Sequence, residues 1–229
     1  MVFQECLLLY TKWPELGNVK TRLAADIGDK HAVGLYRCFI LDMLAVLTQN
    51  PQPVYICYTP ADTEANFRHW LGPAYHYLPQ YGADLGDRMQ RSFHHVFQCG
   101  VQSACLIGSD LPALPSEYVN EAFTRLHQHD SVIGPSDDGG YYLIGFRRET
   151  FFPEIFQDIP WSQPTVYQAT LAKYRQRGTR FFPLFSWDDI DNVHDLQQWY
   201  RQYHNVEYRA PRTVAYIRCH LDGLTRDAD

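Results

Sequence analysis

Two kinds of segment alternate along the chain, distinguished by the spacing of their hydrophobic residues. Short apolar runs, such as ECLLLY, PVYICYT, SACLIG and YYLIGF, are typical of buried strands. Between them lie segments with apolar residues at helical spacing, the longest running roughly from His31 to Gln49. This alternation predicts an α/β fold with a mostly parallel central sheet.

Length and composition bound the organisation of the chain. With 229 residues, 45% of them hydrophobic, the sequence is long enough for one sizeable core, and we expect a single domain over residues 1–229. No repeat, low-complexity segment or linker interrupts it. The tail from about residue 205 carries aromatic and basic residues in no pattern that predicts an element.

Charge and cysteine usage exclude several classes of function. A formal net charge of −6 argues against a nucleic-acid partner, which usually requires a basic face. The apolar run before Lys12 is too short for a signal segment or a membrane span, so we expect a cytoplasmic protein with no membrane partner. Six cysteines are scattered singly, which favours reduced core thiols over disulfides or a zinc site.

The loop after the first predicted strand is basic. Lys12, Lys20 and Arg22 surround a Pro/Gly loop that leads into a helix. Backbone N–H groups at a helix start, with cations nearby, can bind phosphate. A surface loop with solvated cations explains the same letters equally well, since neither a Walker loop nor a GxGxxG motif is present.

Carboxylates stand at two further segment ends. Asp110 follows the apolar run SACLIG, where a metal or an Asx-turn would account for it. Asp188, Asp189 and Asp191 precede a helix that Asn192 can cap, and taken alone they favour simple N-capping. If one of them faces Asp110, the pair can bind Mg²⁺ together with substrate phosphates.

The stretch GPSDDGGYYLIGF places paired acids and paired glycines before an apolar run. A hairpin turn is one interpretation. The other is a ligand-facing loop, in which Gly139 and Gly140 allow close backbone approach and Tyr141 stacks on a sugar or a base. We favour the second interpretation because the polar loop is longer than a two-residue turn.

Taken together, six motifs resemble those of a known family. In order they are KxPxxGxVKTRL, GADLGDRM, LIGSDLP, GPSDDGGYYLIG, IPWS and DIDNVHDL. They are similar to the radical-SAM/selenodomain-associated transferase family 1, whose members are labelled glycosyltransferases of arsenosugar biosynthesis. The resemblance implies a three-layer α/β/α sandwich of the nucleotide-diphospho-sugar transferase (GT-A-like) superfamily. That superfamily also includes the molybdenum-cofactor and phospholactate nucleotidyltransferases.

The resemblance also implies roles for particular residues. Nucleotide phosphates would contact Lys12, Lys20 and Arg22, although the GGxSxRMG pattern of the relatives is missing here. Asp110 and Asp191 would bind Mg²⁺ or Mn²⁺, with Asn192-Val193 replacing the Thr-Pro of many relatives. The nucleotide-enclosing loop would contain Asp84, Gly86 and Arg88, and the wall facing the second substrate would contain Asp138, Gly139, Gly140 and Tyr141.

These observations predict a metal-dependent transferase with a nucleotide-activated donor, preferentially a glycosyltransferase that uses a nucleotide-diphospho-sugar. Its partners are then the nucleotide-sugar and a small-molecule acceptor. We expect Asp110 and Lys20 to act on the leaving diphosphate and Asp138 to be the base for an acceptor hydroxyl. One alternative is a guanylyltransferase-like nucleotidyltransferase, which joins an NTP to a phosphorylated small molecule and releases pyrophosphate. Another is a non-catalytic nucleotide-binding protein.

Overall fold

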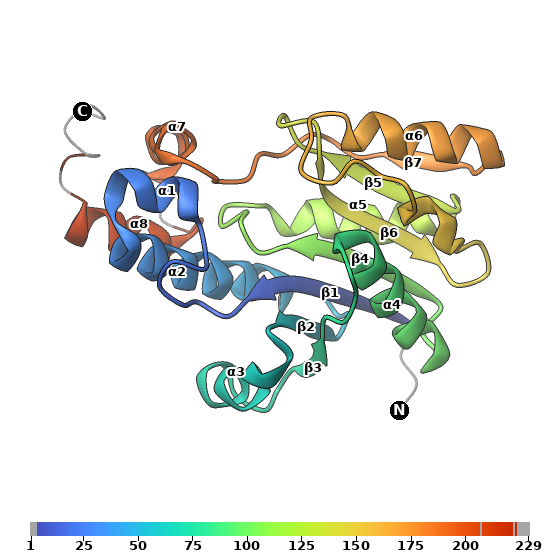
Figure 1. Ribbon diagram of the computed structural model, residues 1–229, viewed down its shortest axis with the longest axis horizontal. Helices are drawn as coiled ribbons and strands as arrows, with labels where there is room; N and C mark the ends of the chain where they lie inside the picture. The colour runs from blue at the N-terminus through green and yellow to red at the C-terminus, as the bar shows by residue number, and fades with distance from the viewer. Residues whose placement is uncertain (1–3, 207, 222, 224–229) are drawn as a thin grey trace.

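A mixed β-sheet forms the centre of the molecule. The computed structural model describes residues 4–206, 208–221 and 223. Seven strands pair in the order β3-β2-β1-β4-β6-β5-β7 (Figure 1). Their bounds are Glu5–Lys12 (β1), Val54–Thr59 (β2), His76–Pro79 (β3), Ser103–Gly108 (β4), Ser131–Pro135 (β5), Tyr141–Arg147 (β6) and Phe181–Pro183 (β7). Only β6 runs antiparallel to its neighbours, so the predicted α/β fold with a mostly parallel sheet is confirmed.

Helices pack on both faces of this sheet. Their bounds are Thr21–Ile27 (α1), Asp29–Leu47 (α2), Glu64–Leu71 (α3), Leu85–Gln98 (α4), Ser116–Leu126 (α5), Val166–Arg177 (α6), Val193–Tyr203 (α7) and Pro211–His220 (α8), with short 3₁₀ turns at Ala61–Thr63 and Pro153–Phe156. Alternate residues of β1 enter different cores: Leu7 and Leu9 pack with α2 and α5, and Leu8 packs with α4. The result is the three-layer arrangement.

The C-terminal tail contains a helix that the sequence did not reveal. Helix α8 packs against α2, and the buried side chain of Asp42 joins them. One carboxylate oxygen of Asp42 accepts hydrogen bonds from the backbone N–H and the hydroxyl of Thr213, at 2.9 and 2.8 Å. The other oxygen lies 3.3 Å from a guanidinium nitrogen of Arg212. A carboxylate at the first turn of a helix stabilises its free N–H groups.

The stretch that connects β5 and β6 is a hairpin. The two strands pair antiparallel, and residues 136–140 join them. The hairpin interpretation, which the sequence analysis ranked second, is therefore right about the topology. Its five-residue loop nevertheless lies at the site described below, because it connects the ends of two central strands.

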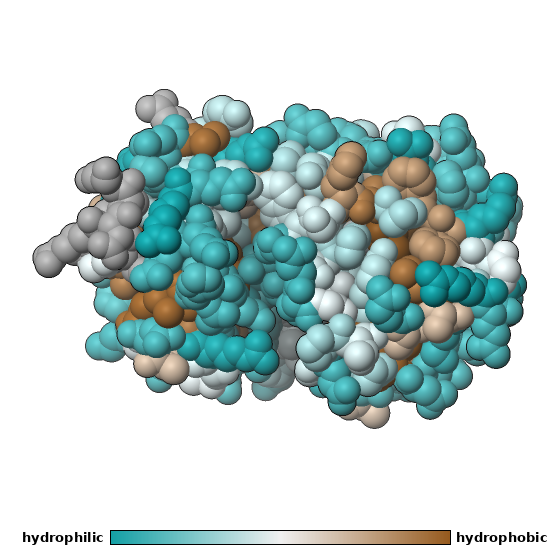
Figure 2. Space-filling model, turned by 90° about the horizontal axis from the view of Figure 1, so that it is seen from above, coloured by the Kyte–Doolittle hydropathy of each residue, from teal (hydrophilic) through white to brown (hydrophobic). Residues whose placement is uncertain are grey.

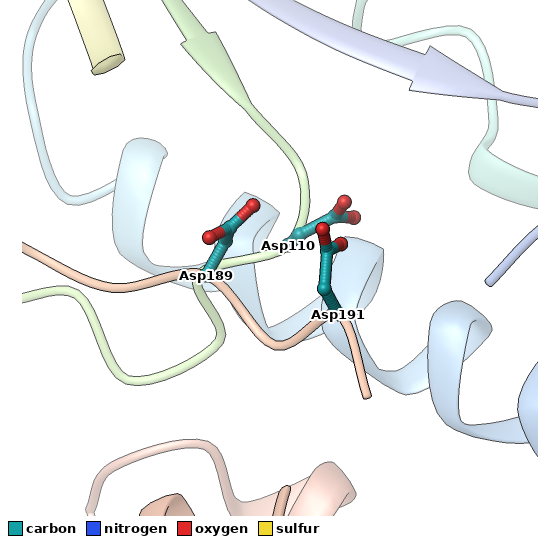
Figure 3. A group of neighbouring side chains, drawn as sticks. All are labelled: Asp110, Asp189 and Asp191. Carbon is teal, nitrogen blue, oxygen red and sulfur yellow. The ribbon is translucent and has the colours of Figure 1, made fainter. Parts of the chain in front are cut away.

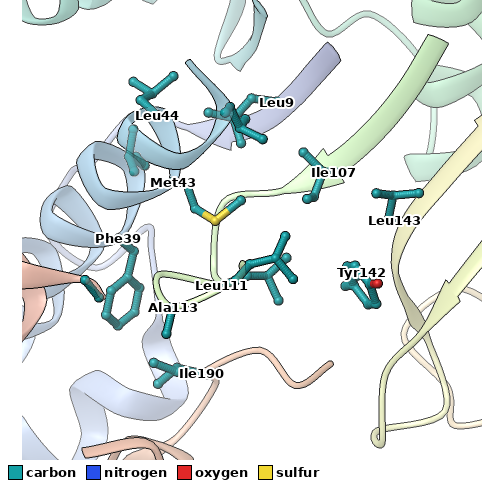
Figure 4. Packing of buried hydrophobic residues seen from close by; sticks show 14 of the residues in the cluster. Leu9, Phe39, Met43, Leu44, Ile107, Leu111, Ala113, Tyr142, Leu143 and Ile190 are labelled. Atoms are coloured by element: carbon teal, nitrogen blue, oxygen red, sulfur yellow. The ribbon is translucent and has the colours of Figure 1, made fainter. Parts of the chain in front are cut away.

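The segments that carry the predicted aspartates are anchored in the core. Figure 4 shows Leu111 and Ala113, which follow β4, and Ile190, which precedes α7, packed with Phe39 and Met43 of α2. All five side chains are buried. Burial on this scale fixes the backbone of both segments, so the polar residues beside them are held in place. No helix of the described residues is both long enough and apolar enough to cross a bilayer.

Candidate active site

Three aspartates form a cluster at the edge of the sheet. Each of Asp110, Asp189 and Asp191 offers a carboxylate oxygen, and these oxygens lie within 4.8 Å of one another. Asp110 follows β4, whereas the other two belong to the extended segment before α7 (Figure 3). The sequence predicted that Asp110 and Asp191 would meet, and the structure brings them together. We call the three residues the aspartate triad.

Strand-like alternation explains why two of these residues face Asp110. Ile190 is only 1% exposed and points into the core, so Asp189 and Asp191 on either side of it point the other way. The backbone N–H of Ile190 donates a 3.2 Å hydrogen bond to the carbonyl oxygen of Asp110, which ties the two segments together.

A capping box fixes the end of the same segment. The Asn192 side chain accepts from the N–H groups of His194 and Asp195, and Asp195 accepts in return from the backbone of Asn192. A carboxylate oxygen of Asp195 also accepts from the Asp191 N–H at 2.9 Å. Helix capping therefore belongs to Asn192 and Asp195, which leaves the carboxylate of Asp191 available to the triad.

Lys20 joins the triad from the β1–α1 loop. Its Nζ lies 2.6 Å from Asp110 Oδ2 and 2.8 Å from Asp191 Oδ1, with the lysine side chain only 5% exposed. The Lys20 backbone has left-handed torsion angles, φ 47° and ψ 46°, which are unfavourable for a residue with a Cβ. Burial by itself would lower the pKa of Lys20, but the two carboxylates outweigh it and raise that pKa. The Lys20 ammonium group is therefore charged at neutral pH.

The triad carries more negative charge than Lys20 can neutralise. Burial, followed by the charge of Asp191, raises the pKa of Asp189 from 3.8 to about 7. For Asp191 the effect of burial is reversed by Lys20, and its pKa is lowered. Three carboxylate groups close together, one of them costly to ionise, are suited to a hard divalent cation. This donor set fits the Mg²⁺ or Mn²⁺ that the fold family implies.

A basic cavity of about 290 Å³ lies on one side of the triad. Its lining includes Lys12, Lys20 and Arg22, the three cations that the sequence predicted together. The Arg22 side chain is 74% exposed and lies 3.5 Å from Asp191, so it is free to turn toward a ligand. The buried hydroxyl of Tyr36 accepts from the Lys12 N–H and contacts Ser109, which joins the ends of β1 and β4 behind this cavity.

A larger aromatic cavity of about 730 Å³ shares Arg22, Asp110 and Asp191 with the basic cavity, and is also lined by Asp189 and by apolar side chains. The apolar side chains include Tyr10, Leu85, Met89, Leu106, Tyr141 and Trp161. Figure 2 shows that one face of the molecule is mostly hydrophilic, with hydrophobic side chains reaching the surface in places, including the half that carries α6.

The β5–β6 loop forms part of the wall of the aromatic cavity. Asp138 and Gly140 line it. One oxygen of Asp138, Oδ1, accepts from the Gly140 N–H at 2.8 Å and from the Ser136 hydroxyl. Gly139 has φ +87°, and a Cβ there would lie 2.0 Å from the carbonyl oxygen of Pro164. Gly139 thus permits tight loop packing and does not line the described cavities.

Tyr141 lines the cavity, and its hydroxyl is buried near the side chain of Thr170. The ring lies edge-on to Trp161, with 6.5 Å between centroids. Trp161 in turn packs on Gly86, where a Cβ would lie 2.8 Å from the indole. Gly86 therefore positions Trp161.

The other predicted residues of the β3–α4 loop serve α4 itself. Asp84 caps the helix by accepting from the Asp87 N–H at 2.8 Å. The Nε of Arg88 donates to the carbonyl oxygen of Gly82 at 3.3 Å. Neither side chain lines the described cavities, whereas their neighbours Leu85 and Met89 do.

Sequence reasoning missed two residues of the site. Asp189 was grouped with Asp188 and Asp191 before the helix, but only Asp191 was assigned to the metal, although the spacing of two between Asp189 and Asp191 in an extended segment places both on one face. Trp161 stood in the quoted IPWS motif, but nothing in the local pattern indicated that it would meet Tyr141 across the cavity.

Comparison with known proteins places the chain in a family. The model described as an uncharacterized protein conserved in bacteria (DUF2064) matches residues 42–163. The chain belongs to this family. Its structure is similar to the crystal structure of a candidate nucleotide-diphospho-sugar transferase from Desulfovibrio desulfuricans G20. The two have a TM-score of 0.93 and are 40% identical in sequence, and the match covers 99% of both chains.

Two more distant proteins resemble this DUF2064 chain. A cytidylyltransferase from Leptospira borgpetersenii serovar Hardjo-bovis (strain JB197) has a TM-score of 0.58 and 11% identity over 98% of both chains, which shows a shared fold. The 3-phospho-D-glycerate guanylyltransferase of Phenylobacterium zucineum (strain HLK1) is 29% identical over an alignment of 154 positions, which covers 61% of this chain. The match spans 66% of that relative, slightly less than two thirds of its length.

Proposed function

We propose that this protein is a divalent-metal-dependent transferase that acts on a nucleotide-activated donor, and that the donor is a nucleotide-diphospho-sugar. The observation that carries the proposal is that the aspartate triad and Lys20 lie where a basic cavity and a larger aromatic one share lining residues. A diphosphate needs cations, and a sugar needs room beside them. The similar structure from Desulfovibrio desulfuricans G20 supports this assignment.

The aspartates and the basic residues of the site have different roles in this proposal. Asp110 and Asp191, with Asp189, would hold a Mg²⁺ or Mn²⁺ ion, which supplies positive charge for the diphosphate when bound. Lys20 and Arg22 add fixed positive charge at the same edge, where negative charge grows on the leaving group. Lys12 extends the basic surface for the phosphates.

Asp138 is the proposed base for the acceptor hydroxyl. Its Oδ1 is occupied by Gly140 and Ser136, and its Oδ2 has no hydrogen-bond partner among the described residues. A held carboxylate with one free oxygen can accept the proton of a hydroxyl group that enters the aromatic cavity. The finer resemblance to arsenosugar-type glycosyltransferases remains a prediction within this proposal.

Nucleotidyl transfer is the second candidate, because the relative from Phenylobacterium zucineum is a guanylyltransferase. The same triad and cations would then support attack on the α-phosphate of an NTP. The two reactions differ in what leaves: a nucleoside phosphate from a nucleotide-sugar, or pyrophosphate from an NTP.

Slow hydrolysis of the donor can distinguish them without knowledge of the acceptor. The purified protein is incubated with a panel of nucleotide-sugars and NTPs, with Mg²⁺ or with EDTA. We expect metal-dependent release of a nucleoside diphosphate or monophosphate from a nucleotide-sugar, and its loss in Asp110→Asn. Release of pyrophosphate from an NTP alone would favour the second candidate. If no nucleotide is bound or cleaved with metal present, both are wrong.

A further inference from the structure

We propose that the aromatic cavity binds an uncharged, hydroxyl-bearing second substrate and disfavours phosphorylated or carboxylated ones. The inference rests on the proposed function, since it concerns the acceptor in the same site. It separates this chain from a relative whose substrate, 3-phospho-D-glycerate, carries both a phosphate and a carboxylate.

The charge of the lining supports this choice. Among the described residues that line the aromatic cavity, Arg22 is the single cation, against Asp110, Asp138, Asp189 and Asp191. Arg22 lies 3.5 Å from Asp191 and therefore belongs to the triad edge, where the donor phosphates are expected. Recognition of a second anion usually depends on arginine or lysine side chains placed for it. Apart from Arg22, no lysine or arginine of the described residues lines the aromatic cavity.

The shape and chemistry of the walls point to a hydroxylated ring or chain. Trp161 and Tyr141 offer aromatic surface, and Leu85, Met89 and Leu106 continue it. Apolar walls with a few placed polar groups are typical of small-molecule sites. The free Oδ2 of Asp138 accepts a hydroxyl hydrogen bond, but it would repel an anion at the same place.

The walls are also built to stay in position. Gly86 lets helix α4 approach the indole of Trp161, and Gly139 lets the β5–β6 loop pack against Pro164. The N–H of Tyr167 donates to the carbonyl oxygen of Gly139 at 2.9 Å, which fixes the loop to α6. A preformed wall that lacks a cation disfavours anionic ligands, because it cannot rearrange to supply one.

Matched probes test the proposal directly. Binding is measured by saturation-transfer NMR and titration for methyl β-D-glucopyranoside, glycerol and myo-inositol, and for glucose 6-phosphate and 3-phosphoglycerate, each with and without Mg²⁺. We expect at least one neutral probe to bind at least tenfold more tightly than both anions. Trp161→Ala should weaken that binding at least tenfold, whereas Trp70→Ala, on α3 and outside the described cavities, should leave it unchanged. Melting temperatures confirm that each variant is folded.

A charge variant gives a second readout. Asp138→Asn removes the repulsion and should reduce the preference for neutral probes over anions at least threefold. Equal or tighter binding of the anionic probes by the wild-type protein overturns the proposal, as does the failure of every neutral probe to give a Trp161-dependent signal. These probes require no nucleotide. If nucleotide-sugars bind with metal but the anions bind best, this inference alone fails. If neutral probes bind but nucleotides do not, the proposed function fails alone.

Discussion

The Nζ of Lys20 lies 2.6 Å from Oδ2 of Asp110, and the same ammonium group reaches Asp191 at 2.8 Å. One buried cation thus joins the strand-end carboxylate to the segment before α7. Lys20 was predicted to contact phosphate, yet in this structure it contacts the carboxylates that are predicted to hold the metal. Lys20 should therefore affect both the stability of the aspartate triad and the affinity of the triad for cations.

Replacement of Lys20 by methionine should increase the affinity of the triad for a divalent cation. The substitution removes a positive charge that contacts two of the three carboxylates, so a metal ion no longer competes with it. We expect Mn²⁺ to bind at least tenfold more tightly in isothermal titration, while donor cleavage falls at least a hundredfold. Lys30→Met, at an exposed position of α2, is the control. Weaker Mn²⁺ binding by Lys20→Met would contradict this account of the site.

Asp189 should destabilise the metal-free protein at neutral and alkaline pH. Its folded-state pKa of about 7 lies above the ordinary value of 3.8. The folded state therefore binds more protons than the unfolded state between about pH 4 and 7, and stability from this group falls as pH rises through that window. Asp189→Asn should raise the free energy of unfolding at pH 8 by about 1–4 kcal/mol without metal.

The comparison at low pH separates this effect from packing. At pH 3 or below the carboxyl group is mostly protonated in both the folded and the unfolded state, and Asp189→Asn should match the wild-type protein in urea denaturation. The same variant should lose most of the stabilisation that Mn²⁺ confers on the wild-type protein. An equal gain in stability at pH 3 and pH 8 would show that ionisation of Asp189 is not its cause.

The contact between Asp42 and helix α8 should be worth a large part of the stability of the C-terminal region. Asp42→Ala leaves the buried N–H and hydroxyl of Thr213 without their acceptor, which costs about 2–4 kcal/mol. Denaturant unfolding measures the loss. Asp29→Ala, at the exposed start of helix α2, which also contains Asp42, should lower the free energy of unfolding by less than about 1 kcal/mol. Equal losses would mean that the Asp42 contact contributes little.

The sequence was informative where a local pattern carries the signal. The apolar run of β4 ends at a polar turn, which made Asp110 visible as a strand-end carboxylate, and the fold class followed from the alternation of elements. The meeting of Lys20, Asp110 and Asp191 depends on contacts between segments far apart in the chain. The resemblance to known motifs, rather than the local pattern, indicated that the two aspartates belong together.

Other features required the three-dimensional structure. The side chains of Asp84 and Arg88 make hydrogen bonds within α4 and the loop before it. The sequence could not show this, because a polar residue near the start of a helix can either cap the helix or face a ligand. Helix α8 was missed because its stability comes from packing on α2 and from Asp42, both distant in sequence. Likewise, the edge-on contact of Tyr141 with Trp161 forms only when the β5–β6 hairpin meets the segment before α6.

The most direct test of the proposed metal site is a calorimetric titration of nucleotide-sugars into the wild-type protein with Mg²⁺ and with EDTA. The same titration into Asp110→Asn and Asp191→Asn removes the two carboxylates that contact Lys20, and Asp62→Asn, exposed and outside the described cavities, is the control. The account predicts Mg²⁺-dependent binding of at least one nucleotide-sugar by the wild-type protein and the control, weakened at least tenfold in both triad variants. Binding that is equally strong in EDTA, or unchanged in both triad variants, would contradict it.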